Sequence, residues 1–272
     1  MTTFKEQFII DVLKKQELNG LDPFFAQKEL DALLETNDAL SRVAHDLFLK
    51  ENHRAAGYKL LVKALRKRLR DKFGVYHLQT KKKTGTFSDD DVFKLLQTHR
   101  STNERLSFYA QVYGELFAKI VPTSIHDLGC GLNPLSSIFL PTNVTYYAFD
   151  LPNKDLHLLQ TFFQTRQQTG SAAPLDLMDL EAVDNAVQRP DTIFLFKVLD
   201  DLERGKRGHS KKLLELLLSK HPRMIVISFP TQTIGGKQQQ SHRGWLVRVL
   251  TELGVRADSF VIPTELFFVV KL

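Results

Sequence analysis

The segment from residue 125 to 134, Ile-His-Asp-Leu-Gly-Cys-Gly-Leu-Asn-Pro, constrains the fold of this chain more than any other part. An apolar lead-in precedes it, and an apolar run able to form a helix begins at Ser136. Nineteen residues after Gly131, the apolar segment 146–149 ends in Asp150. A strand, a glycine turn, a helix and a second strand ending in an acid form the nucleotide site of doubly wound α/β domains.

The composition of the glycine turn indicates which nucleotide it would hold. It reads Asp-x-Gly-x-Gly from Asp127 to Gly131, with Cys130 between the glycines, and lacks a third glycine and a basic residue to hold a pyrophosphate. The glycines allow close backbone approach, and the acid at Asp150 can accept hydrogen bonds from ribose hydroxyls. S-adenosylmethionine has an adenosine and an amino-acid tail but no phosphate. The turn therefore favours this cofactor over a dinucleotide.

The periodicity of apolar residues predicts two domains. Helical spacing dominates the first 120 residues, where helices are expected at 4–18, 22–35, 37–50, 55–73 and 101–120, with another starting after Ser88. Strands are expected afterwards at 123–128, 145–149, 192–197, 223–229, 257–262 and 265–271, and less clearly near 173–177. Helices are expected between them at 153–167, 209–220 and 242–253.

This order of elements predicts an α/β fold. Alternating strands and helices imply a parallel sheet, and the last two strands, joined only by Pro263-Thr264, form an antiparallel hairpin. Seven strands with the last one antiparallel are typical of the Rossmann-like class I S-adenosylmethionine-dependent methyltransferases. We expect a helical domain over residues 1–98 and a methyltransferase domain over 99–272.

Positive charge is concentrated in one segment of the chain. The formal net charge is +6, and between Lys50 and Lys83 twelve Lys and Arg oppose only Glu51 and Asp71. Such a block indicates a polyanionic partner, although a solvated helix face followed by a lysine-rich loop would look the same. The candidate RNA-binding residues are Lys63, Arg66, Lys67, Arg68, Arg70, Lys72, Lys81, Lys82 and Lys83.

The remaining composition is that of a soluble globular protein, with 43% hydrophobic and 25% charged residues. Neither a signal-peptide core near the N-terminus nor an apolar run of the ~20 residues needed to cross a bilayer is present. We therefore expect a cytoplasmic, monomeric protein that does not bind membranes. Cys130 is the single cysteine, which excludes an internal disulfide and a cysteine-rich zinc site, and no metal is expected. It could be a methyl-accepting nucleophile, but a small residue packed under the cofactor is the better interpretation.

The segment after the fourth strand limits the methyl acceptor. Enzymes that methylate exocyclic amines carry an Asn/Asp-Pro-Pro-Phe/Tyr signature there, whereas this chain reads Phe196-Lys197-Val198-Leu199. Guanine N7 has a free lone pair and no proton to lose, so its methylation needs positioning more than acid–base catalysis. The missing signature does not exclude C5, 2′-oxygen or protein acceptors.

Three further segments gain meaning when they are read together with the glycine turn. His99 to Leu106 precedes the first strand; it can be a simple N-capped helix, with Ser101 or Thr102 as the cap and Glu104 completing a capping box. The segment from Ser228 to Lys237 ends the fifth strand and could form a loop over the target base, with Ser228, Phe229, Pro230 and Thr231 at its start. Thr264-Glu265-Leu266 opens the final strand.

These segments, in this order, resemble the aminoglycoside-resistance 16S rRNA (guanine-N7) methyltransferases of the Arm/Rmt type. The shared motifs are His-x-Ser-Thr-x-Glu-Arg-Leu at 99–106, Cys-Gly-Leu-Asn-Pro-Leu at 130–135, Phe-Lys-x-Leu-x-x-Leu-Glu at 196–203, Ser-Phe-Pro-Thr-x-x-x-Gly-Gly at 228–236 and Thr-Glu-Leu at 264–266. The resemblance runs from His99 to Lys271, and the basic helix at 55–73 is also similar. After Gly236 the chain departs from the family pattern, continuing Lys-Gln-Gln-Gln.

The resemblance implies a substrate and a set of cofactor contacts. The substrate would be a decoding-site guanine in helix 44 of 16S rRNA within the 30S subunit, methylated for aminoglycoside resistance or as a related housekeeping modification. The N-terminal helical domain would bind the rRNA. Cofactor contacts are expected from His99, Ser101, Arg105, Asp127, Gly129, Cys130, Gly131, Asp150, Asp179, Leu180 and Lys197.

Two alternatives stay open at this point. The chain could be a methyltransferase of the same fold that acts on another rRNA or tRNA site. It could also be a catalytically silent RNA-binding protein, although a silent protein would not need both the glycine turn and Asp150.

Overall fold

The computed structural model describes residues 3–15, 18–73, 87–140, 144–151, 153–231 and 243–272, with only the backbone of 71–73. Within it the chain divides into two compact units. Unit 1 comprises Met1–Tyr76 with Pro152–Lys154, and unit 2 comprises His77–Leu151 with Asp155–Leu272. The boundary therefore falls before the expected one at 98/99. The reason is that the helix at 89–98 contributes Val92, Leu95 and Leu96 to the core of unit 2.

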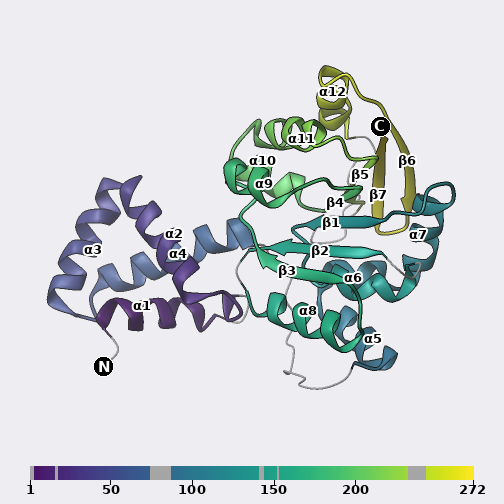
Figure 1. Ribbon diagram of the computed structural model, residues 1–272. Coiled ribbons are helices and arrows are strands. Elements are labelled where there is room, and N and C mark those ends of the chain that lie inside the picture. The colour runs from purple at the N-terminus through teal and green to yellow at the C-terminus, as the bar shows by residue number, and fades with distance from the viewer. Residues whose placement is uncertain (1–2, 16–17, 74–86, 141–143, 152, 232–242) are drawn as a thin grey trace. The chain divides into compact units, whose positions relative to one another are not determined.

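Unit 1 consists of helices, the first three of which begin at side-chain caps. They are α1 (Phe4–Leu13), α2 (Pro23–Glu35), α3 (Asp38–Lys50) and α4 (Ala56–Phe73), drawn in purple and blue in Figure 1. Thr3, Asp22 and Asn37 accept backbone N–H bonds at the starts of the first three. Fully buried side chains from α1, α2 and α4 make the core, namely Phe8, Val12, Leu30, Leu61 and Leu65. The expected helices are confirmed, except that the first ends at Leu13 instead of Leu18.

Unit 2 is built on a seven-stranded sheet whose order is β3-β2-β1-β4-β5-β7-β6. The strands are β1 (Ser124–Leu128), β2 (Thr145–Asp150), β3 (Gly170–Pro174), β4 (Thr192–Phe196), β5 (Met224–Pro230), β6 (Ala257–Ile262) and β7 (Glu265–Lys271). All neighbours pair in parallel except β7, which is antiparallel to both β5 and β6. This arrangement confirms the expected class I methyltransferase fold.

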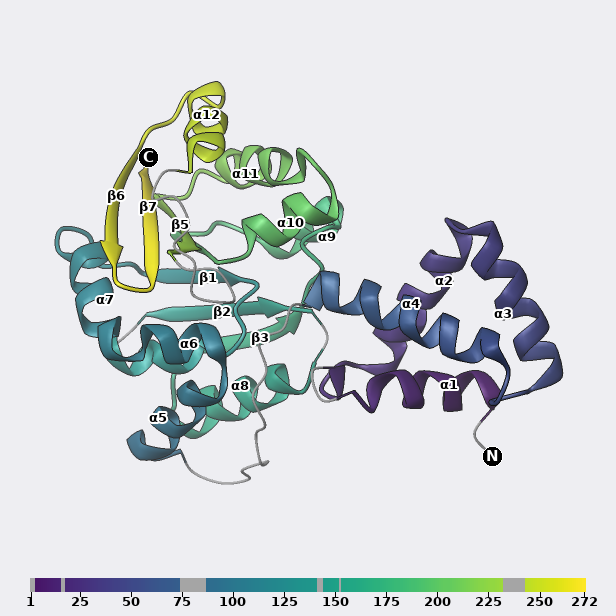
Figure 2. The same cartoon turned by 180° about the vertical axis from the view of Figure 1, so that it is seen from behind.

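Helices cover both faces of the sheet, as Figures 1 and 2 show. They are α5 (Asp89–Thr98), α6 (Arg100–Arg105), α7 (Tyr109–Phe117), α8 (Lys154–Thr165), α9 (Leu180–Ala186), α10 (Leu199–Gly205), α11 (His209–Ser219) and α12 (Gly244–Glu252). Alternate strand residues enter opposite cores because side chains alternate along a strand. In β4, Phe194 packs with α5, α7 and α8, whereas Ile193 and Leu195 pack with α9, α11 and α12.

Three local expectations need correction. The helix expected from Ser136 is a 3₁₀ helix, η3 (Asn133–Phe139), that starts at the end of the glycine turn. The helix expected over 101–120 is divided into α6, the 3₁₀ turn η2 (Leu106–Phe108) and α7. The strand expected near 173–177 begins earlier, at Gly170. The N-cap predicted at Ser88 is confirmed, since its hydroxyl accepts the Asp91 N–H.

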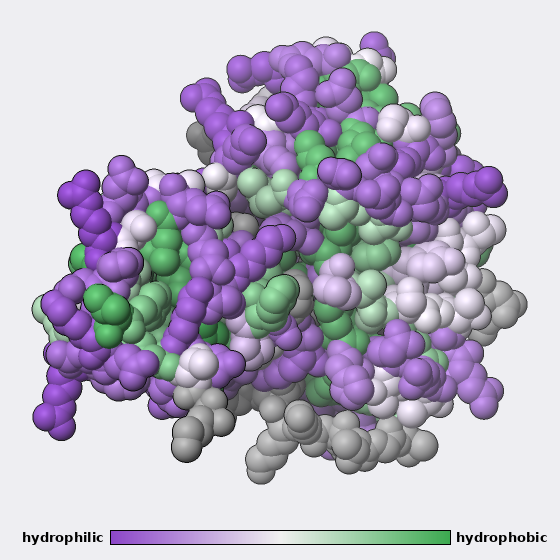
Figure 3. Space-filling model, turned by 60° about the vertical axis from the view of Figure 1, so that its left-hand side comes forward, coloured by the Kyte–Doolittle hydropathy of each residue, from purple (hydrophilic) through white to green (hydrophobic). Residues whose placement is uncertain are grey.

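Surface character agrees with the composition. The face drawn in Figure 3 is mostly hydrophilic, with apolar residues scattered among polar ones. None of the helices that the structure describes is long and apolar enough to cross a membrane. Within the same described residues, no group of three His, Cys, Asp or Glu side chains could hold a metal ion.

Candidate cofactor and target site

The ends of several strands bring the expected site residues to one edge of the sheet. β1, β2, β4 and β5 run in parallel, so their carboxyl ends meet at this edge. β7 runs the other way, and its first residue, Glu265, pairs with Pro230 at the end of β5. Ligands of open α/β sheets bind outside the carboxyl ends of the strands. This edge is therefore the candidate site.

The turn after β1 adopts a backbone conformation that favours glycine, as the sequence predicted. Gly129 and Gly131 have φ of +73° and +50°, a region that side-chain-bearing residues rarely adopt. A Cβ atom at Gly129 would lie 2.9 Å from Val198, and one at Gly131 would lie 3.0 Å from the His99 ring. His99, expected near the cofactor, is thus packed against the turn.

Cys130 lies between the glycines and is 5% exposed. Burial, reinforced by the nearby carboxylates of Asp150 and Asp127, raises the pKa of its thiol well above the ordinary value. A thiolate is the nucleophilic form of cysteine, so this environment favours a packed, neutral side chain. The packing interpretation of Cys130 therefore fits the geometry better than a methyl-accepting role.

Asp150 ends β2 and faces the turn. Its Oδ2 accepts the Gly131 N–H at 2.6 Å, and its Oδ1 accepts the Leu151 N–H at 2.7 Å. Burial raises the pKa of Asp150 to about 6, while the two backbone hydrogen bonds oppose the rise. The carboxylate is ionised at neutral pH, and each oxygen keeps a lone pair that a ribose hydroxyl could use.

Asp127 has a different role, because its side chain is fully buried. Its Oδ2 accepts hydrogen bonds from Asn133 Nδ2 at 2.8 Å and from the Tyr146 hydroxyl at 2.6 Å. Among the described atoms no partner is found for its Oδ1. Burial raises the pKa of Asp127 to about 6 against these two hydrogen bonds and the positive charge of Arg105. Asp127 thus helps to fix the glycine turn through the hydrogen bonds of its buried carboxylate.

Asn133 connects this acid to the neighbouring helix. Its Oδ1 accepts from Arg105 Nη1 at 2.8 Å and from the Tyr109 hydroxyl at 3.0 Å, while its Nδ2 donates to Asp127. A guanidinium can only donate and an ionised carboxylate can only accept, so one orientation of the amide satisfies both. Asn133 is therefore the central residue of a buried polar network.

Arg105, expected at the methionine end of the cofactor, is fully buried and bound to protein groups. Its Nε and Nη2 bond the two carboxylate oxygens of Glu265 at 3.0 and 2.7 Å. The remaining guanidinium hydrogens face Asn133, Tyr109 and Ser101, the last two at 3.4 Å. All five N–H groups thus have protein acceptors, which indicates that Arg105 positions α6 against β7.

Lys197 follows β4 with φ of +59°, a left-handed conformation that is uncommon for a lysine. Its ammonium is buried and lies 2.7 Å from Glu104 and 3.4 Å from Glu265. Glu104 also pairs with Arg100 at 2.8 Å, so it does not complete the expected capping box. Helix α6 instead begins after His99, without a side-chain cap bond.

The prediction that residues 228–231 begin a loop over the target base is wrong for the first two of them. Ser228 and Phe229 lie within β5 and are fully buried, so they cannot cover a base. The Ser228 hydroxyl donates to Glu265 and joins the buried network. Pro230 ends the strand, and the Thr231 hydroxyl donates to Pro263 O at 2.8 Å. Residues 232–242, which hold the rest of the expected loop, lie outside the described part of the chain.

Asp179 and Leu180 lie at the start of α9, beyond β3. The Asp179 carboxylate accepts the Ala182 N–H at 3.0 Å and caps that helix. Its side chain is exposed, whereas Leu180 is half-buried. The two residues occupy the same carboxyl edge of the sheet as Asp150, since β3 pairs with β2 up to Pro174.

The expected RNA-binding residues on α4 fall into two groups. Lys63 and Lys67 are exposed. The guanidinium of Arg66 donates to Asp11 O and Val12 O at the end of α1, and Arg68 pairs with Glu29 of α2 at 2.7 Å. These two arginines hold unit 1 together. The side chain of Lys72 and the residues Lys81, Lys82 and Lys83 lie outside the described residues.

Sequence reasoning missed three members of the buried network as individual residues: Glu104, Asn133 and Glu265. Each stands within one of the family motifs, but two contacts of the network join positions 160 residues apart, namely Arg105 with Glu265 and Thr264 with the Glu104 backbone oxygen. The available signal was a polar residue at the edge of an apolar strand, as with Glu265 before Leu-Phe-Phe-Val-Val.

Comparisons with known proteins place the chain among enzymes that modify ribosomal RNA. The family described as ribosomal RNA methyltransferase (FmrO) matches residues 86–269. A 16S rRNA (guanine(1405)-N(7))-methyltransferase of Frankia casuarinae is 30% identical over 188 residues, which are 66% of this chain and 63% of that protein. A protein with the same name from Serratia marcescens is 29% identical over 218 residues, covering 78% of this chain and 84% of that protein.

A solved structure supports the fold. The 16S rRNA methyltransferase RmtF in complex with S-adenosyl-L-homocysteine matches with a TM-score of 0.61 and 24% identity, over 90% of this chain and 97% of that one. The match to the Frankia casuarinae protein spans less than two thirds of that relative's length.

Proposed function

Because the chain belongs to the ribosomal RNA methyltransferase (FmrO) family, we propose that it transfers a methyl group from S-adenosylmethionine to N7 of a guanine in 16S rRNA. The family match over residues 86–269 carries the proposal, and the names of the relatives supply the base and the atom. The geometry at the carboxyl edge of the sheet supports the cofactor half of it.

The residues at this edge fit an adenosine-containing cofactor. The Gly129–Gly131 turn has no Cβ atoms at the two positions where they would collide with Val198 and His99. Asp150 would accept the ribose hydroxyls. By the family resemblance, Asp179 and Leu180 would lie near the adenine, and His99 and Ser101 toward the methionine end. Arg105 and Asp127 would act indirectly. Arg105 would fix the position of α6, and Asp127 would fix that of the glycine turn.

The bound cofactor would supply an electrophilic methyl group on a sulfonium. The guanine N7 lone pair would accept this methyl group, and the electron pair of the C–S bond would stay on sulfur in S-adenosyl-L-homocysteine. No proton leaves the acceptor, so the protein has to align donor and acceptor rather than supply a base. The buried hydrogen-bond network below the site would serve that task by limiting the movement of α6, the turn and β7.

The finer identity of the substrate follows the family resemblance. We propose a decoding-site guanine in helix 44 of the assembled 30S subunit, recognised by the helical unit and methylated by a monomer in the cytoplasm. The basic row on α4 supports RNA binding, because phosphate contacts dominate the affinity of such complexes. The physiological effect would be aminoglycoside resistance or a related housekeeping modification.

Methyl transfer to separate substrates tests the proposal. The protein is incubated with methyl-labelled S-adenosylmethionine and with 30S subunits, naked 16S rRNA or tRNA. We expect label on 30S subunits. Label on tRNA alone would show a related enzyme with a different substrate, and binding of 30S subunits without any label would show a silent RNA-binding protein.

A further inference from the structure

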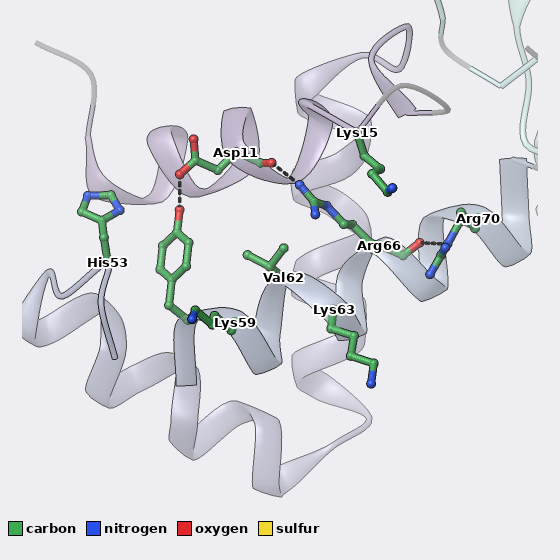
Figure 4. A pocket seen from close by; sticks show the side chains of 9 residues that line it. Asp11, Lys15, His53, Lys59, Val62, Lys63, Arg66 and Arg70 are labelled. Atoms are coloured by element: carbon green, nitrogen blue, oxygen red, sulfur yellow. Dashed lines mark hydrogen bonds between the residues drawn. The ribbon is translucent and has the colours of Figure 1, made fainter. Parts of the chain in front are cut away.

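Unit 1 contains a hollow of about 500 Å³ between α1 and α4 that the proposed chemistry does not use. Figure 4 shows its lining, with Asp11 and Lys15 on the α1 side, His53 at one end, and a row from α4 along the other side. The α4 row consists of Tyr58, Lys59, Val62, Lys63, Arg66 and Arg70. We refer to this hollow as the α1–α4 groove.

The spacing of the α4 row follows from helix geometry. Lys59, Lys63, Arg66 and Arg70 are separated by four, three and four residues, which keeps them on one face of the helix. At 1.5 Å per residue the row spans roughly 16 Å. It is therefore long enough to meet more than one phosphate of an extended strand.

The single acid of the groove is already neutralised within unit 1. Asp11 accepts hydrogen bonds from the Tyr58 hydroxyl at 2.6 Å and from the Lys14 ammonium at 2.7 Å. These bonds, together with one from Gln7, hold the pKa of Asp11 below its ordinary value although burial acts to raise it. The groove therefore has a strong excess of positive charge at neutral pH.

The cations of the groove differ in what they are bound to. Arg66 is engaged by the α1 carbonyls, and Arg70 Nε donates to Arg66 O at 3.3 Å. Lys15, Lys59 and Lys63 are exposed, and among the described residues none of the three has an ion-pair or hydrogen-bond partner. The lysines can thus bind an external anion without losing an internal contact.

An aromatic side chain closes one end of the groove. His53 is exposed, and its ring lies 4.4 Å from Phe4 and 5.2 Å from Tyr58, centroid to centroid. Phe4 and Tyr58 hold the imidazole ring in place, and the part of the ring that they do not cover is exposed to solvent. Flat side chains beside a basic groove are the usual platform for unpaired bases in single-stranded RNA.

We infer that the α1–α4 groove binds an unpaired segment of the substrate RNA, with backbone phosphates on Lys59 and Lys63 and a base against His53. The inference rests on the proposed function for the identity of the RNA, and it deepens that function by locating one contact. It also distinguishes Lys59 and Lys63, which bind RNA, from Arg66 and Arg68, which hold the helices of unit 1 together.

The test measures binding of 30S subunits to the full chain as a function of salt. The variants are Lys59→Ala/Lys63→Ala and His53→Ala, and the control is Lys28→Ala, an exposed lysine on α2 outside the groove. Each phosphate contact removed lowers the slope of log K against log salt by about one. We expect the double variant to lose about two from this slope and at least tenfold in affinity.

His53→Ala should behave differently, because stacking involves no counterion release. We expect an affinity loss of at least threefold with an unchanged salt slope. Lys28→Ala should match the wild type, and the charge-conserving double variant Lys59→Arg/Lys63→Arg should keep the salt slope that Lys59→Ala/Lys63→Ala loses. Cofactor affinity should be unchanged in all of these variants. Thermal unfolding should be unchanged in the lysine variants, whose altered side chains are exposed, and slightly lower in His53→Ala, which loses the ring contacts with Phe4 and Tyr58.

Three results would overturn the inference. A double variant that matches Lys28→Ala in slope and affinity would show a solvated surface. An unchanged affinity for His53→Ala would remove the base contact. Failure of the wild-type chain to bind 30S subunits would show that the groove is not an RNA-binding site. Lysine-dependent binding without methyl transfer would instead leave the groove intact and contradict only the proposed function.

Discussion

At the scale of single residues, Asp150 is the side chain whose position best supports the proposed cofactor site. Its two oxygens accept the Gly131 and Leu151 N–H groups and are oriented toward the turn. The proposed ribose contact is therefore held in place before any ligand binds. Preorganisation of this kind lowers the entropy cost of binding.

Replacing Asp150 by alanine should weaken S-adenosylmethionine binding by about 1–3 kcal/mol, because the ribose acceptor and the anchor of the turn are lost. Isothermal titration calorimetry measures this effect. Asp258→Ala, which removes only an exposed partner of Lys271, serves as the control. A cofactor Kd equal to that of the control would show that Asp150 is not at the ribose.

Asp127 predicts a specific pH dependence of stability. Burial raises its folded-state pKa to about 6 from an ordinary 3.8, so between about pH 4 and 6 the folded state binds more protons than the unfolded state. Raising the pH through this window should therefore lower the free energy of unfolding, by roughly 3 kcal/mol from this group. Asp150, with a pKa of about 6, acts in the same direction.

Asp127→Asn should remove the Asp127 part of this dependence while keeping an oxygen for Asn133 and Tyr146. Urea unfolding of wild type and variant at pH 4, 5, 6 and 7 gives the two curves. The difference between them should change across the window by roughly 3 kcal/mol. Parallel curves would mean that the pKa of Asp127 is not raised by burial.

At the scale of elements, a buried ion pair ties α6 to β7. Arg105 and Glu265 are both fully buried and bonded through two hydrogen bonds, and Lys197 joins them from the end of β4. Glu265→Gln would leave the Arg105 charge without its directly bonded counter-charge, at a cost of about 3–5 kcal/mol. Urea denaturation measures the loss.

The matched control for Glu265 is Glu252→Gln, which breaks an exposed pair with Lys211. Exposed pairs contribute about 0–1 kcal/mol, so the control should stay close to the wild type. If Glu265→Gln cost no more than this control, the network would not stabilise the edge of the sheet.

The elements also show which features can be read from the sequence. The strands, the glycine turn and Asp150 were predictable because short continuous apolar runs, as in β4 and β5, and a short local motif define them. The 3₁₀ helix η3 was not predictable. Its first residue, Asn133, forms hydrogen bonds with Arg105 and Asp127, which come from other elements. Arg105 was expected to face the cofactor, but its guanidinium is hydrogen-bonded to Glu265, which lies 160 residues later in the chain.

The same limit applies to the basic helix. A run of Lys and Arg predicts a polyanionic partner, but it does not reveal which cations have partners within the chain. Arg66 and Arg68 bond α1 and α2, whose residues lie about 40 to 55 positions earlier. Only tertiary structure separates these from the exposed lysines at 59, 63 and 67.

At the scale of the whole molecule, the two units carry separate parts of the proposed task. Unit 2 has the fold, the glycine turn and the acid of a methyl-donor site. Unit 1 has a positively charged groove with an aromatic end. Neither unit alone accounts for the proposed function, which requires both a methyl donor and recognition of one guanine in a large RNA.

Mapping the modified base tests the central claim most directly. Treated 30S subunits are reduced with borohydride and cleaved with aniline, which breaks the chain at N7-methylguanine, and primer extension then locates the break in 16S rRNA. We predict one new stop, at a guanine of the decoding site in helix 44, that requires both the protein and S-adenosylmethionine. Methyl label in 16S rRNA without any aniline-sensitive guanine would contradict N7 as the acceptor.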